Sequence, residues 1–190
     1  NRRNFLNFAY PEGNKKVRIE SPAQAWNAVS VGAMTHRVKI AEGDEASERS
    51  RALAPREGLS PFSRTSAEWS PHWPIKPEIV MEGGNLAVDE QGDFVEKDSL
   101  ELISTAPDFL QKPLCNMNGT SAATASASRL GAILQARFPG YWAETYRGLM
   151  VHAARWSPTM IGTTRLHRAG SCDDVQKLLR VYGFGEPYAP

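Results

Sequence analysis

The sequence of 190 residues has few cysteines, no surplus of either charge and no long apolar run. Its two cysteines, Cys115 and Cys172, could form at most one bridge, which excludes a disulfide framework and a cysteine-based zinc site. The net charge is +1, from 22 basic and 21 acidic residues, whereas nucleic-acid and polybasic membrane surfaces need a strong positive excess. No apolar run approaches the roughly 20 residues that span a bilayer. We therefore expect a soluble chain that has neither a nucleic acid nor a membrane as its partner.

Neither end of the sequence carries a complete structural element. Asn1-Arg2-Arg3-Asn4 is polar and leads into no signal-peptide core, and the residues after Val181 leave a helical pattern without starting another element. The length suits one domain of ordinary size. We therefore expect an internal piece of a larger domain, without a targeting segment of its own, and the compartment stays open.

Strand patterns dominate the first two thirds of the chain. Short apolar or alternating segments predict strands in residues 17–20, 28–34, 77–84, 100–105 and 113–117. The polar stretch 85–99, centred on Gln91-Gly92-Asp93, predicts a hairpin or an insertion, and residues 1–27 and 41–73 are expected to be mainly loop.

The pattern becomes helical from residue 119 onwards. Apolar spacing predicts helices over residues 119–138 and 142–155, and a last helix that begins at Ser171. The Ser171 hydroxyl can cap the N–H of Asp174, whose carboxylate reaches back, and Gly183 supplies the left-handed exit. Strands followed by helices predict an α/β sandwich with a mostly parallel sheet.

The segment from Asn118 to Ala127 is the most informative for chemistry. Ser121 follows a tight Asn-Gly turn and lies in the first helical turn, where unpaired N–H groups and the helix dipole stabilise negative charge. If the Ser121 hydroxyl attacked a carbonyl, its own N–H would point toward the developing oxyanion. The alanines that follow let the helix run close to a sheet and be buried along its length, and Gly119 lets substrate or backbone approach where a β-carbon would collide. An ordinary helix cap followed by a good helix former would have the same composition.

Other kinds of site are less well supported. An α/β-hydrolase elbow needs Gly-x-Ser-x-Gly, and Ala123 occupies its last position here. The pair Gly183-Phe184-Gly185 follows a helix and lacks the later glycine of a dinucleotide loop. The four histidines are scattered and the acidic run 42–48 reads as a solvated loop, so no metal site is predicted.

Six segments in chain order resemble the subtilisin-like serine proteases, the subtilases. Residues 119–125, Gly-Thr-Ser-Ala-Ala-Thr-Ala, are similar to the family's nucleophile motif, with Thr124 in place of the usual proline. The other five segments are Val29–Ala33, Pro61–Ser63, Lys76–Val80 followed by Gly83, Ile103–Pro107 and Tyr182–Pro187. The resemblance covers essentially the whole chain.

The resemblance implies an α/β, three-layer subtilisin-like fold with a mostly parallel sheet, incomplete in this chain. Residues 1–190 would be the C-terminal part of a single catalytic domain with an insertion at 85–99. The implied activity is that of a serine endopeptidase acting through an acyl-enzyme on Ser121, with Gly119 and Thr120 at the site. The Asp and His of the triad would lie outside this chain. Asn1 would be the oxyanion asparagine, and Asn14 is a second candidate.

The implied partners are a peptide or protein substrate and the remainder of the catalytic domain. No cofactor is identifiable, and a structural calcium ion, which the resemblance allows, is not placed. Alone, the chain should be nearly inactive, because a serine hydroxyl is a weak nucleophile without its base. The alternative is a subtilase-like domain without activity that serves as a binding or structural module. The presence of both Gly119 and Ser121 favours activity.

Overall fold

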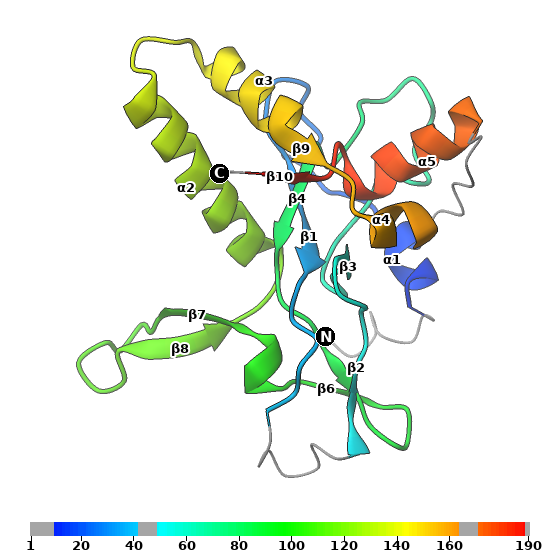
Figure 1. Cartoon of the computed structure of the whole chain (residues 1–190), viewed down its shortest axis with the longest axis vertical. Helices are drawn as coiled ribbons and strands as arrows, with labels where there is room; N and C mark the ends of the chain where they lie inside the picture. The colour runs from blue at the N-terminus through cyan, green and yellow to red at the C-terminus, as the bar shows by residue number, and fades with distance from the viewer. Residues whose placement is uncertain (1–9, 42–48, 164–170, 189–190) are drawn as a thin grey trace.

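A computed structural model describes residues 10–41, 49–163 and 171–188 (Figure 1). The sequence prediction of a mixed α/β chain is confirmed. In chain order the elements are α1 (Glu12–Lys16), β1 (Val31–Thr35), β2 (Arg51–Ala52), β3 (Gly58–Leu59), β4 (Ile79–Glu82), β5 (Ala87–Val88), β6 (Phe94–Val95), the 3-10 helix η3 (Asp98–Leu100), β7 (Leu102–Thr105), β8 (Leu114–Met117), α2 (Thr120–Arg137), α3 (Ala143–Ala153), β9 (Ala154–Arg155), α4 (Pro158–Thr163), α5 (Cys172–Tyr182) and β10 (Glu186–Pro187).

The centre of the structure is a small sheet in the order β3-β1-β4. Strands β1 and β4 are parallel, with Val31 opposite Ile79, and β3 pairs antiparallel with β1. On its other side β4 meets the segment before β10, because the N–H of Val80 donates to the carbonyl of Gly185 at 3.0 Å. This sheet positions the end of β4 beside the start of α2.

The expected predominance of parallel pairing is not confirmed. Within the described residues β1–β4 is the parallel pair of named strands, while β5–β6, β7–β8 and the remaining pairs are antiparallel. Two of these pairs are hairpins between strands adjacent in sequence, and short connections of this kind can join only antiparallel strands. The predicted hairpin over residues 85–99 is confirmed by β5 and β6.

Helices cover both faces of the central sheet, and each face has its own apolar core (Figure 1). Successive strand residues point to opposite faces, so Val80 packs in one cluster and its neighbour Ile79 in the other. The first cluster, toward α4 and α5, comprises Met34, Leu59, Val80, Met160, Leu178, Val181 and Tyr182. The second, toward α2 and α3, comprises Ile79, Ala127, Leu130, Met150 and Ala154.

A buried ion cluster fixes the start of β4. Lys76 is completely buried, and its ammonium donates to Glu78 at 2.5 Å and to the carbonyl of Ala28 at 2.7 Å. Glu78 also accepts from Arg147 of α3 at 2.8 Å and from the backbone N–H of Ser30 at 2.7 Å. Buried charges persist when they are paired and hydrogen-bonded, as here. The cluster therefore ties the strand to the helix layer that carries α2.

Among the described residues, no helix is both long enough and apolar enough to cross a membrane.

Candidate active site

Ser121 lies in the first turn of α2, as the sequence predicts. The residue is exposed, and within the described residues its hydroxyl has no hydrogen-bond partner. The hydroxyl of the neighbouring Thr120 is likewise unpaired there, although its carbonyl accepts from Thr124 at 2.8 Å. Ser121 is therefore accessible to solvent and to an incoming ligand rather than engaged in the fold.

The N-terminus of α2 has no side-chain cap. Gly119 occupies the N-cap position, and its carbonyl accepts from the N–H groups of Ala122 and Ala123 at 3.1 and 3.5 Å. Within the described part of the chain, the N–H groups of Thr120 and Ser121 make no hydrogen bond. Unpaired N–H groups at a helix start, together with the helix dipole, favour a negative charge beside them.

Gly119 provides the turn into the helix through its backbone conformation. Its φ is +105°, which side-chain-bearing residues rarely adopt. A β-carbon at this position would meet no atom of the described residues within 4 Å, so no backbone approaches it there, and the approach of a substrate stays a prediction. The glycine is required for φ, and the space next to it is open.

The turn before Ser121 is pinned to the end of β4. The N–H of Gly119 donates to the carbonyl of Gly83 at 2.7 Å, and the N–H of Gly83 donates to Met34 of β1 at 2.9 Å. A β-carbon on Gly83 would lie 2.5 Å from the β-carbon of Ala33 and 3.1 Å from the carbonyl oxygen of Gly119. Only a glycine fits between β1 and the nucleophile segment, so this contact sets how the segment approaches the sheet.

Helix α2 is buried along one face. Ala122, Ala123 and Ala127 let it pack closely on β1 and β4, while Ala125 and Ser128 are exposed and Ile133 is 45% exposed. The buried residues of α2 end at Leu130, so the predicted burial along the whole length of the helix is found only over its first eleven residues. The open face begins at Ser121.

The structure adds a contact that the sequence does not reveal. The side-chain amide of Asn118 donates to the carboxylate of Glu101 at 2.7 Å. The partners are 17 positions apart and belong to no recognised motif, so no local signal could have identified the pair.

The candidate oxyanion asparagines have different outcomes. Asn1 lies outside the described residues. The side-chain amide of Asn14 donates to the carbonyls of Ser60, Pro61 and Ser63 at 3.0 to 3.2 Å. Because those carbonyls use its donor group, Asn14 acts as a clamp on the 60–63 turn, and its candidacy is wrong.

No described histidine contacts Ser121. His36 contacts the Glu186 carboxylate at 3.0 Å, His72 and His152 are exposed, and His167 lies outside the described residues. Within the described residues, no group of three or more histidine, cysteine or acidic side chains could hold a metal ion, so no calcium site is assigned.

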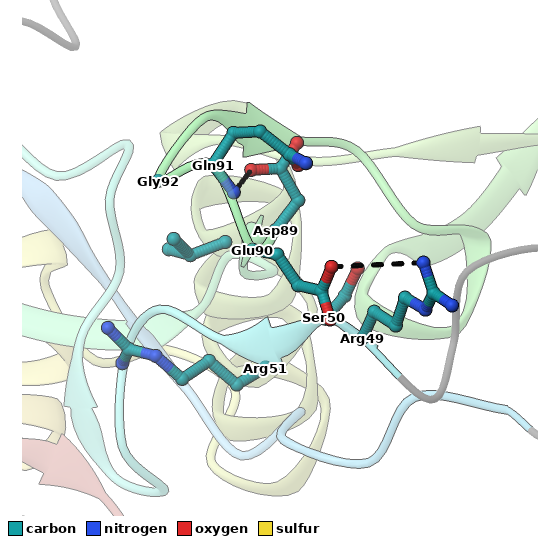
Figure 2. Close-up of a pocket in the computed structure, with 8 residues that line it drawn as sticks. Arg49, Ser50, Arg51, Asp89, Glu90, Gln91 and Gly92 are labelled. Carbon is teal, nitrogen blue, oxygen red and sulfur yellow. Dashed lines mark hydrogen bonds and ion pairs between the residues drawn. The ribbon is translucent and has the colours of Figure 1, made fainter.

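Two surface hollows lie away from Ser121. One of about 600 Å³ lies between β2 and the β5–β6 turn, where Arg49 and Glu90 reach toward each other at 3.8 Å (Figure 2). The second, of about 500 Å³, is lined by Gly148, Val151, His152, Ala154, Arg155, Trp156 and Phe184. Neither hollow includes the nucleophile segment.

Comparison with known proteins agrees with the resemblance in the sequence. The model of the subtilase family, peptidase family S8, matches residues 1–185. Searches of curated proteins and of solved structures give no significant match. The match spans nearly all of the chain, and the subtilases are serine proteases; this chain therefore belongs to the subtilase family.

Proposed function

We propose that the chain is the C-terminal part of a single subtilase catalytic domain, and that Ser121 is the nucleophile of a serine endopeptidase. The observation that carries the proposal is the exposure of Ser121 and the lack of hydrogen-bond partners for its hydroxyl and N–H within the described residues. The residue lies in the first turn of an uncapped helix. A serine that stabilised this helix start would stand at the N-cap position, which Gly119 occupies, whereas Ser121 lies two positions further on with its hydroxyl free for a ligand.

The proposed reaction proceeds through an acyl-enzyme. The Ser121 hydroxyl oxygen attacks the carbonyl carbon of the scissile peptide bond while a histidine from outside this chain accepts its proton. The resulting oxyanion accepts hydrogen bonds from the N–H of Ser121 and from the side chain of Asn1. The C–N bond then breaks, the amine leaves with the proton from the histidine, and water hydrolyses the ester to free Ser121.

The fold supports the other assignments at the site. Gly119 gives the turn its positive φ and leaves open space beside it, where the substrate backbone would lie next to Thr120. The exposed face of α2 is the surface that we assign to the remainder of the catalytic domain, which would bring the Asp and His of the triad. The β5–β6 hairpin falls in the segment assigned as an insertion, residues 85–99. Without the remainder of the domain this chain should be nearly inactive.

Fluorophosphonate labelling of the protein that carries the complete domain tests the nucleophile. The reagent should modify Ser121, and Ser121→Ala should abolish the labelling. Ser128→Ala is the matched control, because Ser128 lies exposed on the same helix and its hydroxyl donates to the Thr124 carbonyl at 2.9 Å. Labelling should persist in that variant. A folded protein that is not labelled would contradict the proposal and favour an inactive binding or structural module.

A further inference from the structure

Glu101 contacts the nucleophile segment through Asn118. Its carboxylate accepts from the side-chain amide of Asn118 at 2.7 Å, and both residues are partly buried. This is the one hydrogen bond of the Asn118 side chain within the described residues. The orientation of Asn118, three positions before Ser121, is thus held by a residue from a different part of the chain.

The backbone around Glu101 is anchored in the fold. Leu100 of η3 is completely buried, and its carbonyl accepts from the N–H of Asn85 at 2.9 Å. Gly84 fills the space between the two segments, because a β-carbon there would lie 3.0 Å from the β-carbon of Asn118 and 3.2 Å from the carbonyl oxygen of Leu100. The backbone next to Glu101 is therefore fixed by packing and hydrogen bonding, and so is the position from which its carboxylate binds Asn118.

The nucleophile segment needs such a restraint. Gly119 follows Asn118 at φ +105°, and a glycine in a turn has more accessible backbone conformations than any other residue. In the part of the chain that the structure describes, two hydrogen bonds hold the turn to the body of the protein, one from the N–H of Gly119 to Gly83 and one from Asn118 to Glu101. Loss of either would let the first turn of α2, with Ser121 on it, shift relative to the sheet.

A carboxylate is an electrostatically costly choice at this place. Burial and the nearby carboxylates of Glu96 and Asp98 raise the pKa of Glu101, while the bond from Asn118 lowers it. The hydrogen bond is the one interaction among these that favours the ionised side chain. The contact with Asn118 is thus the feature of its surroundings that favours a hydrogen-bond acceptor at this position.

We infer that Glu101 is a positioning residue for Ser121, acting through Asn118 to fix the turn that presents the hydroxyl. The inference rests on the proposed function, since it requires Ser121 to be the nucleophile. Glu101 itself does not touch the substrate. Its removal should therefore lower kcat and leave KM nearly unchanged, because substrate contacts remain and only the alignment of the attacking oxygen is lost.

The experiment compares three variants of the protein that carries the complete catalytic domain, with a peptide substrate. Glu101→Ala should lower kcat by about tenfold to a hundredfold. Glu101→Gln keeps an acceptor oxygen and should restore most of the rate. Glu96→Ala removes an exposed carboxylate of the same neighbourhood that has no bond to Asn118, and should leave kcat unchanged. Thermal unfolding of each variant checks that the protein is folded.

Asn118→Ala supplies a second readout. If Glu101 acts through Asn118, the double variant Glu101→Ala with Asn118→Ala should be no slower than Asn118→Ala, so that the two effects are not additive. Additive effects, an unchanged kcat in folded Glu101→Ala, or equal losses in Glu96→Ala would overturn the inference while labelling of Ser121 keeps the proposed function intact. If the wild-type protein is not labelled at all, both are overturned.

Discussion

Helices α2 and α5 each begin at or next to a serine, and these two serines have opposite roles. At α5, the Ser171 hydroxyl accepts from the N–H of Asp174, and the Asp174 carboxylate accepts from the N–H of Ser171, both at 3.3 Å. At α2 the N-cap is Gly119, and Ser121 lies two positions further on with its hydroxyl unpaired within the described residues. The first turn of α5 holds Asp173 and Asp174 and that of α2 holds no acidic residue, and of the two helices α5 is the one that uses its serine as a cap.

The difference shows how position within the first turn decides what a serine can do. An N-cap serine reaches back over the helix end and satisfies one of its own N–H groups. A serine inside the first turn points outward, and the N–H groups of an uncapped helix start stay available for an external anion. Helix α2 has a glycine at its N-cap, which costs roughly a few tenths of a kcal/mol relative to a capping serine, and the helix is held by packing on β1 and β4.

The largest expected effect separates the two serines by activity. In the complete catalytic domain, Ser121→Ala should lower the turnover of a peptide substrate by about 10⁶-fold, the loss known for removal of a triad serine. Ser171→Ala should leave turnover unchanged, because that hydroxyl is used only within α5. Steady-state kinetics on the two variants measures this. Comparable losses in both would mean that the α2 serine has no special role.

The second effect concerns the contact that places α2 against the sheet. Gly83→Ala would put a methyl group 2.5 Å from the Ala33 β-carbon, and relief of that overlap must displace the nucleophile turn. We expect turnover to fall by about a hundredfold and the free energy of unfolding to fall by about 1–3 kcal/mol.

Gly131→Ala is the control for this substitution. It adds the same methyl group within α2, where the nearest atom, the sulfur of Met150, is 4.0 Å away. That variant should keep its turnover and gain about 0.5–1 kcal/mol from the better helix propensity of alanine. A fully active Gly83→Ala protein would contradict the assigned contact.

The third effect is on stability, where the substitution of Ser171 should have the larger effect and that of Ser121 the smaller. Ser171→Ala removes a capping box and should lower the free energy of unfolding by about 1 kcal/mol. Ser121→Ala should change it by less than about 0.5 kcal/mol, because an exposed hydroxyl without a partner is lost. Denaturant unfolding of both variants gives the two values. A larger loss in Ser121→Ala than in Ser171→Ala would show that Ser121 is structural.

The smallest effect is a pH dependence at Glu101. Its pKa is raised, first by burial and then by Glu96 and Asp98, so the folded protein holds this proton more tightly than the unfolded chain. The resulting stabilisation is complete below the unfolded pKa of about 4.3 and is lost as the pH rises through the folded pKa. Glu101→Gln cannot ionise, so its melting temperature should rise relative to wild type as the pH increases from below the unfolded pKa to above the folded one. A constant difference would show that the carboxyl has an ordinary pKa.

Local patterns in the sequence predicted much of the fold. The capping box at Ser171 follows from two residues three positions apart and is confirmed. The helix ends at Gly183 with the predicted positive φ of +58°, but its ψ of −141° lies outside the left-handed helical region. The β5–β6 hairpin and the helices α2 and α3 follow from similarly local periodicity. Helix α1 was not predicted, since its five residues are too few to show a helical period, and the six-residue α4 was missed for the same reason.

The site was predictable only where a motif carried it. Ser121 and Gly119 are recognisable from one short segment, and the structure shows how the segment lies. The bond between Glu101 and Asn118 and the close approach of Gly83 to Ala33 depend on packing between segments distant in sequence. No periodicity encodes such contacts, because they are fixed by the way that the strands and turns assemble.

The central claim is that the Ser121 oxygen forms a covalent bond with the substrate acyl group. Rapid acid quenching of the complete domain with a peptide ester, followed by mass spectrometry of the digested protein, tests it most directly. An acyl adduct on Ser121, appearing within the first turnover and absent from Ser121→Ala, is the predicted result. Two results would contradict this claim. One is turnover of the ester with the acyl adduct on another residue, and the other is turnover without an adduct on Ser121 under conditions that slow the hydrolysis of an acyl-enzyme.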